Sequence, residues 1–141
     1  MRSRLLNFAL FATVSLGATL VSAQTDPAAF RYLQHCAGCH LIDGSGVPPE
    51  VPNLRSDLGY LLNSPEGRDY MLRVPGVIGV PIPGEEVVDL MNWIITSFYP
   101  DLTDFEPFTI EEIEAGRTRP LFDPLGYRSE LFPELYPDLS E

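Results

Sequence analysis

The chain has 141 residues, a formal net charge of −11 and two cysteines, and these numbers already exclude several classes of protein. Nine arginines and no lysine stand against 20 acidic residues, so the overall field repels a phosphate backbone and we expect no nucleic-acid partner. Two cysteines are too few for a disulfide scaffold, and 45% apolar residues are too many for a wholly disordered chain. The length favours one domain.

Residues 1–23 have the pattern of a secretory signal peptide. Arg2 and Arg4 precede a long uncharged apolar run, which ends in the small residues Val21-Ser22-Ala23. The alternative is an uncleaved membrane anchor, but the run is shorter than the roughly 20 residues that a membrane span needs. We therefore expect cleavage after Ala23, a mature chain without a membrane anchor, and a periplasmic location.

Three stretches of the mature chain carry strong helix signals. Asp26-Pro27 has the pattern of an N-cap followed by proline at the first helical position, and it predicts a helix that runs into Cys36. Ser64-Pro65 repeats this pattern and predicts a second helix that ends near residue 74. Residues 85–98 combine acidic residues in the first turn with apolar residues at a period near 3.6, and they predict a third helix.

The segments between these helices are rich in proline and glycine. Residues 41–54 and 76–84 are predicted as loops. Thr109 and Glu112 have the spacing of a capping box and predict a short fourth helix. No stretch sustains the alternation of apolar and polar residues that is typical of a strand. The sequence therefore predicts an all-α fold.

Residues 99–141, called here the C-terminal extension, differ in composition from the rest of the chain. They hold 11 acidic residues, three basic residues and six prolines. Irregularly spaced aromatic residues accompany them: Phe105, Phe108, Phe122, Tyr127, Phe132 and Tyr136. We interpret the segment as an extended acidic tail that lies on the core and buries these rings; the alternative is a docking arm for a larger partner. The chain is thus divided into residues 1–23, 24–98 and 99–141.

Cys36-Ala37-Gly38-Cys39-His40 has the form C-x-x-C-H, which is the attachment sequence of a c-type haem. Two thiols three positions apart at the end of a helix can reach both vinyl groups at one edge of a porphyrin. Nε2 of the histidine that follows can then reach the iron. We therefore expect one haem c, bound covalently through thioethers at Cys36 and Cys39, with His40 as the proximal iron ligand.

Other sites also use a C-x-x-C pair, namely a dithiol redox centre, half of a zinc site, or a structural disulfide. A zinc site needs further ligands, and His35 is the only other histidine. A thioredoxin-like centre needs a βαβ unit, which the sequence does not predict. The alternative that stays open is a non-haem structural or docking module in which Cys36 and Cys39 form a disulfide or bind a metal.

Beyond this motif, residues 25–98 resemble the class I c-type cytochromes. The similar segments are Asp43-Gly44-Ser45-Gly46 for the glycine-rich loop, Val51-Pro52-Asn53-Leu54 for the Pro-Asn-Leu segment, and Leu90-Met91-Asn92-Trp93-Ile94 for the C-terminal helix. The resemblance implies a small helical fold around one haem, with Trp93 packed against the N-terminal helix. It also implies that the carbonyl of Pro52 accepts a hydrogen bond from Nδ1 of His40 and orients this ligand.

The sequence departs from the family at the sixth iron ligand. Family members usually have a methionine between the last two core helices, but this stretch contains none here, and Gly79 stands near its place. Met71 on the preceding predicted helix is our candidate distal ligand, and Met91 is the other methionine of the mature chain. His35 directly precedes the haem motif and is expected to be exposed or to cap a helix. An open sixth site is the remaining alternative.

The resemblance implies electron transfer rather than an enzymatic reaction. The chain would act in the periplasm as a soluble carrier or as the electron-transfer subunit of a dehydrogenase. Because it lacks lysine, we expect it to dock on a basic or apolar patch of its redox partner. The alternative function is an open iron site that binds a small ligand, as in gas sensing or a peroxidase. Arg55, Tyr60 and Arg73 are candidates for hydrogen bonds to the haem propionates.

Overall fold

The computed structural model describes residues 25–134 and 136, and all regular secondary structure in this part of the chain is helical. Its helices are α1 (Pro27–His35), α2 (Ala37–His40), α3 (Leu58–Leu62), α4 (Pro65–Met71), α5 (Pro75–Ile78), α6 (Gly84–Phe98), α7 (Ile110–Arg117) and α8 (Pro124–Leu131). The prediction of an all-α fold is confirmed. The expected signal peptide lies outside the described residues. Within the described part, no helix combines the length and the apolar character needed to span a bilayer.

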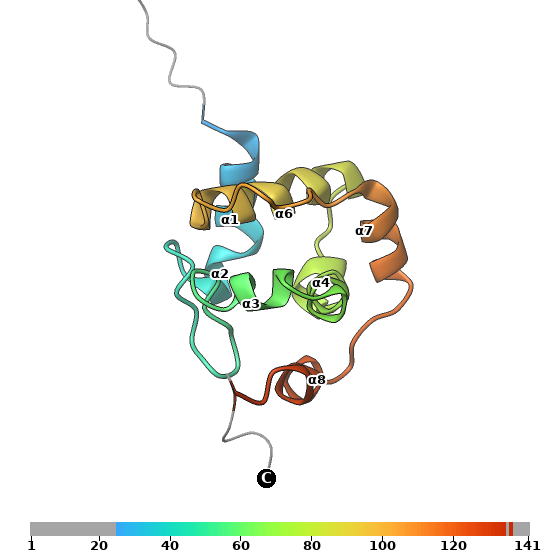
Figure 1. The fold of residues 1–141 in the computed structure, drawn as a ribbon. Coiled ribbons are helices and arrows are strands. Elements are labelled where there is room, and N and C mark those ends of the chain that lie inside the picture. Colours follow the sequence, from blue (N-terminus) through green and yellow to red (C-terminus); the bar gives the residue numbers. More distant parts are fainter. Residues whose placement is uncertain (1–24, 135, 137–141) are drawn as a thin grey trace, which may run out of the picture.

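The helices are arranged in levels, as Figure 1 shows. Helices α1 and α6 cross at the top, α2, α3 and α4 lie below them, and α8 lies at the bottom beneath α4. Helix α7 packs against α6 at one side, so the C-terminal extension runs down this side before it reaches α8. This path brings the end of the described chain to the bottom of the molecule, where the hydroxyl of Tyr136 donates to Asp57 at 2.7 Å.

The crossing of α1 and α6 is the part of the fold that the sequence predicts best. Oδ1 of Asp26 accepts a hydrogen bond from the amide of Ala28 at 2.8 Å, so the predicted N-cap of α1 is confirmed. Tyr32 is buried on α1, and its ring centroid lies 5.5 Å from that of Trp93 and 5.6 Å from that of Phe98. The expected packing of Trp93 against the N-terminal helix is therefore present, and these rings fix the crossing.

The middle level differs from the prediction in detail. Ser64 caps α4 by accepting the amide of Gly67 at 3.0 Å, as predicted, but the helix ends at Met71. Helices α3 and α5 were not predicted, because each has only four or five residues. Pro75 was interpreted as the stop of the preceding helix, and residues 76–84 as a loop, but Pro75 begins α5. A Cβ atom on Gly67 would collide with the carbonyl of Leu61, so only glycine allows α3 and α4 to pack this closely.

The C-terminal extension forms two helices rather than an extended arm. The capping box of α7 is confirmed: Thr109 accepts the amide of Glu112 at 3.3 Å, and Glu112 accepts the amide of Thr109 at 2.9 Å. Helix α8 was missed, although Asp123 caps it with a 2.9 Å bond from the amide of Gly126. The extension packs on the core through the buried rings of Phe108 and Tyr136, whereas Phe122 is 96% exposed.

Arg68 of α4 holds the beginning of the extension in place. Its Nε lies 2.7 Å from Oε1 of Glu112, and its Nη groups donate to the carbonyls of Glu106 and Pro107 at 2.8 and 3.0 Å. The guanidinium also lies over the ring of Phe108, 4.2 Å from its centroid. The extension is therefore an integral part of the fold.

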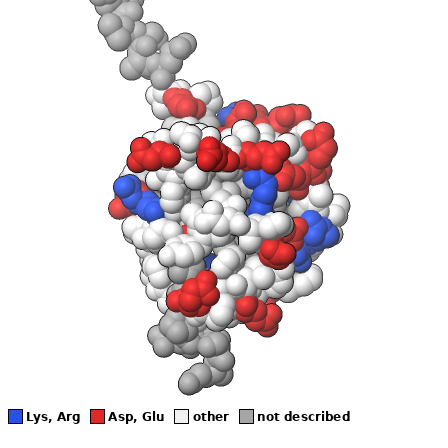
Figure 2. All heavy atoms as spheres, viewed as in Figure 1, with Lys and Arg blue, Asp and Glu red and all other residues white. Residues whose placement is uncertain are grey.

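Acidic side chains cover more of the face shown in Figure 2 than arginines do.

Candidate functional site

A cavity of about 320 Å³ lies between the helices, and residues from every level of the fold line it. Most of the wall is aliphatic and comes from the loop before α3 and from α3 to α6: Leu54, Leu58, Leu61, Val74, Val77, Val80, Val87, Leu90 and Ile94. Such a wall suits a large, flat, apolar group and excludes water. The polar residues at the cavity are few and come from the C-x-x-C-H motif, its neighbour His35, Glu50, Tyr70 and Arg128.

The C-x-x-C-H residues lie where α1 ends and α2 begins. The amide of Cys36 closes α1 by donating to the carbonyl of Tyr32 at 2.9 Å, and the carbonyl of Cys36 accepts the amide of His40 at 2.9 Å. This short turn places Cys36, Cys39 and His40 together at one wall of the cavity. The two predicted thioether positions and the predicted proximal ligand are thus neighbours in space.

The surroundings of the two cysteines do not favour the other uses of a C-x-x-C pair. Both thiols are free. Burial, with a smaller contribution from nearby Cys39, raises the pKa of the Cys36 thiol to about 11, whereas a dithiol redox centre needs a lowered thiol pKa. No group of three or more His, Cys, Asp or Glu side chains in the described part of the chain could complete a zinc site.

His40 is held by the loop that follows it. Its Nδ1 lies 3.1 Å from the carbonyl oxygen of Pro52, which is the contact that the resemblance implies. Burial lowers the pKa of His40, and the bond to Pro52 acts in the opposite direction. The neutral imidazole therefore donates from Nδ1 to Pro52, and Nε2 is left available as a ligand atom.

The loop from residue 41 to 54 is shaped by glycines at positive φ. Gly46 has a φ of +62°, its amide donates to the carbonyl of His40 at 3.0 Å, and a Cβ there would lie 2.5 Å from the carbonyl oxygen of Pro52. Only glycine therefore lets the chain bring Pro52 back to His40. Leu41 has a φ of +63°, which is unusual for a branched side chain, and the hydroxyl of Tyr32 fixes it by donating to its carbonyl at 2.7 Å.

The two methionines of the described chain both lie at the cavity. Met71 on α4 is 3% exposed, and Met91 on α6 is 7% exposed. Gly79, which stands near the family's methionine in sequence, is exposed and does not line the cavity. Its neighbours Val77 and Val80 do line it.

Of four further polar residues that the sequence singled out, only His35 lines the cavity. His35 is half-buried and lines the cavity, so it is neither fully exposed nor a cap. Arg55 and Tyr60 are exposed and lie away from the cavity wall. Arg73 lies away from it too, because it pairs with Asp69 at 2.8 Å and donates to a backbone carbonyl of the extension. Nearness in sequence to the enclosing loops did not place these three side chains near the cavity.

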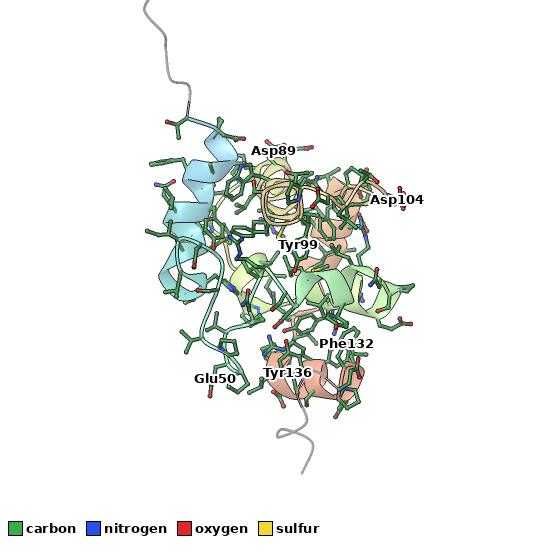
Figure 3. All side chains as sticks on the ribbon, turned by 60° about the vertical axis from the view of Figure 1, so that its left-hand side comes forward. Glu50, Asp89, Tyr99, Asp104, Phe132 and Tyr136 are labelled. Atoms are coloured by element: carbon green, nitrogen blue, oxygen red, sulfur yellow. The ribbon has the colours of Figure 1, made fainter. Side chains whose placement is uncertain are left out.

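Sequence reasoning missed Arg128, which α8 brings to the cavity. Its side chain is 1% exposed. Figure 3 shows Glu50 and Tyr136 at the end of the molecule that holds α8, the helix that carries Arg128. The only signal in the sequence is that Arg128 is one of three basic residues in an acidic segment, and such a residue usually lies on the surface.

Comparison with known proteins finds two relatives of this chain with significant sequence similarity. No protein-family model matches the chain. The chain is 30% identical over 132 residues to a "Cytochrome c-552" of Thermus thermophilus, and the match covers 79% of this chain and 87% of that protein. A second Thermus thermophilus "Cytochrome c-552" is 29% identical over 106 residues, which covers 61% of this chain and 81% of that protein. The first match is longer than residues 1–98, so it includes part of the C-terminal extension.

Proposed function

Because this chain belongs to the c-type cytochromes, we propose that it is an electron carrier with one haem in the apolar cavity, bound through thioethers at Cys36 and Cys39. The observation that carries the proposal is the position of the C-x-x-C-H residues at this cavity, with Nδ1 of His40 3.1 Å from the carbonyl of Pro52. When bound, the haem supplies an iron that changes between the ferric and ferrous states.

The residues around the cavity fit such a group. Two free thiols and one imidazole meet at a single wall, which is the donor set that covalent attachment of haem requires. His40 binds the iron through Nε2, while Pro52 fixes the imidazole ring and raises its basicity as a ligand. The aliphatic walls exclude water, which favours the less charged ferrous state and limits the rearrangement that accompanies a change of charge.

For the sixth iron ligand we propose Met71. It is buried at the cavity wall on α4, and its thioether is a soft ligand that stabilises ferrous iron. Met91 lies on α6 at the same cavity and is the natural comparison. A free sixth position, as in a gas-binding or peroxidase-like protein, is the competing outcome of the tests below.

We further propose that the chain is secreted through residues 1–23 and works in the periplasm, as a soluble carrier or as the subunit of a dehydrogenase. A net charge of −11 without any lysine supports docking on a basic or apolar patch of the redox partner. If charge guides the encounter, the rate of electron transfer falls as the salt concentration rises.

Spectroelectrochemistry of the full chain, secreted by a bacterium that has the haem-attachment machinery, tests this function. We expect a reversible one-electron change with a low-spin spectrum in both states and no change on addition of carbon monoxide. A ferrous form that binds carbon monoxide rapidly would instead establish an open iron site and overturn the proposal of a simple carrier.

A further inference from the structure

Arg128 has a buried positive charge for which the described chain offers no negative partner. Its Nη1 donates to the hydroxyl of Tyr70 at 3.3 Å, and its Nη2 donates to the carbonyl of Pro49. Its Nε is buried without a hydrogen-bond partner in the described structure. The ion pairs of the described residues involve other arginines, although Arg128 is 1% exposed.

A buried arginine in this state needs an anion. Arginine stays protonated in proteins, so it cannot escape burial by losing its charge. The ring of Tyr136 lies 4.4 Å from the guanidinium carbon and stabilises the cation, but it does not neutralise it. The unpaired Nε–H therefore indicates that a carboxylate or a similar anion belongs beside Arg128.

Carboxylates of residues 25–134 do not fill this place. Glu50 lines the same cavity, but its side chain is exposed and forms no ion pair with Arg128. Asp57 forms no ion pair with Arg128 either. Its Oδ2 accepts a hydrogen bond from the hydroxyl of Tyr136 at 2.7 Å. Arg128 lines the cavity, so an anionic group bound there can reach its guanidinium.

We propose that Arg128 donates hydrogen bonds to a propionate carboxylate of the haem, so that the C-terminal extension completes the haem site. This inference rests on the proposed function, because the propionates are the only carboxylates of that group. Their edge of the porphyrin is opposite the edge that carries the thioethers, and Arg128 comes from α8 while the cysteines come from α1 and α2. A guanidinium fork can bind a carboxylate through two parallel hydrogen bonds, which makes it a suitable partner.

Arg128 is thus a positioning residue, and its effect on the propionate can be measured. A carboxylate beside a buried guanidinium ionises well below neutral pH, whereas one buried without it ionises near or above neutral pH. Ionisation near the iron favours the ferric state and lowers the reduction potential. The tyrosines that face Arg128 do not interfere, since burial raises the pKa of Tyr70 and of Tyr136 above their ordinary values. Glu50 and Asp57 are the nearby carboxyls to control for, and His35, which lines the same cavity, is the imidazole to control for.

The test is the reduction potential of the full haem-loaded chain as a function of pH, with resonance Raman spectra of the propionate bending bands. We expect the wild-type potential to be flat between about pH 5.5 and 8, and Arg128→Gln to show a fall with rising pH in this range. Arg128→Lys keeps the charge without the fork, so we expect its potential to fall at a lower pH than the potential of Arg128→Gln. The matched control is Arg119→Gln, which removes an arginine of the same extension whose side chain is 51% exposed. The propionate band should shift in Arg128→Gln and not in the control.

Each outcome decides the matter. A wild-type inflection in this range that persists in His35→Gln, or identical Raman bands in wild type and Arg128→Gln, overturns the proposal. If Glu50→Gln alone reproduces the effect of Arg128→Gln, the partner is Glu50 and the proposal is again overturned. If Arg128→Gln does not fold, the wild-type titration and Arg128→Lys still decide. A chain without bound haem has no such potential at all, so failure of the proposed function would be seen separately.

Discussion

The two sides of the cavity are built in different ways. His40 and Pro52, which form the side with the haem motif, are 12 residues apart, and glycines in the loop between them close the contact. On the side formed by α8, Arg128 contacts Tyr70 and Pro49, which are 58 and 79 residues away. One side is specified by neighbours in the sequence, and the other depends on how the whole chain folds back.

This difference explains what each side contributes. The local side carries the two proposed thioether positions and the proposed proximal ligand, and a short motif suffices to hold them. The distant side carries a charge whose place is set by the docking of the C-terminal extension through Arg68, Glu112 and Phe108. Substitutions on the local side should therefore have larger effects than substitutions on the distant side.

Replacement of both Cys36 and Cys39 by serine should have the largest effect. We expect no haem to remain with the chain on a denaturing gel, because both thioethers are lost. Each single replacement leaves one tether and serves as the control, with haem retained in reduced yield. Peroxidase staining of the gel and the absorbance of the denatured protein measure the result. Covalent haem in the double variant would show that attachment does not depend on this motif.

Met71→Ala and Met91→Ala should separate a ligand from a packing residue. Both remove a buried side chain, and each is expected to cost about 2–5 kcal/mol in the free energy of unfolding. Only Met71→Ala should convert the ferric spectrum to high spin and allow carbon monoxide to bind the ferrous form. If Met91→Ala changes the spin state while Met71→Ala leaves it intact, the assignment of the sixth ligand is reversed.

Arg68→Ala should loosen the distant side while the motif stays intact. It removes the ion pair to Glu112 and two hydrogen bonds to backbone carbonyls of the extension, and we expect a loss of about 2–3 kcal/mol in chemical denaturation. Arg31→Ala is the matched control. Its side chain is equally 20% exposed but forms a single ion pair, to Glu86, so about 1 kcal/mol or less is expected. Equal losses would mean that Arg68 does not hold the extension.

Glu112→Gln should have the smallest effect, and it depends on pH. The hydrogen bond from Arg68, which outweighs the effect of burial, lowers the pKa of Glu112 from its ordinary value. A lowered carboxyl pKa contributes stability that is present above about pH 4.3 and is lost as the pH falls through the folded-state pKa. The variant should therefore lose less stability on acidification, by up to about 1 kcal/mol.

The control for this titration is Glu111→Gln, which removes the same charge from an exposed position of the same helix without touching Arg68. Thermal unfolding of the three proteins at several pH values gives the comparison. A pH dependence in Glu112→Gln as steep as that of the wild type would show that this ion pair contributes nothing.

The same contrast between local and distant contacts decides how much the sequence could predict. The caps at Asp26, Ser64 and Thr109 and the periodicity of α6 are signals within a few residues, and the structure has these elements. Helix α8 was missed because Asp123-Pro124 stands in a stretch rich in turn-forming residues, without a strong apolar period after it.

The candidate site follows the same rule. Pro52 was found beside His40 because a local motif and a family resemblance pointed to it. Arg55, Tyr60 and Arg73 were chosen for their nearness to loops in the sequence and lie away from the cavity, whereas Arg128 has no local signal that distinguishes it from a surface arginine. Only the fold of the whole chain shows which cation is buried.

The central claim is that a haem is bound covalently at Cys36 and Cys39, and the intact mass of the secreted chain under denaturing conditions tests it most directly. The account predicts the mass of the mature polypeptide plus that of one haem, and a tryptic peptide with both cysteines that carries the added mass. A secreted chain with only the mass of its amino acids would contradict the account.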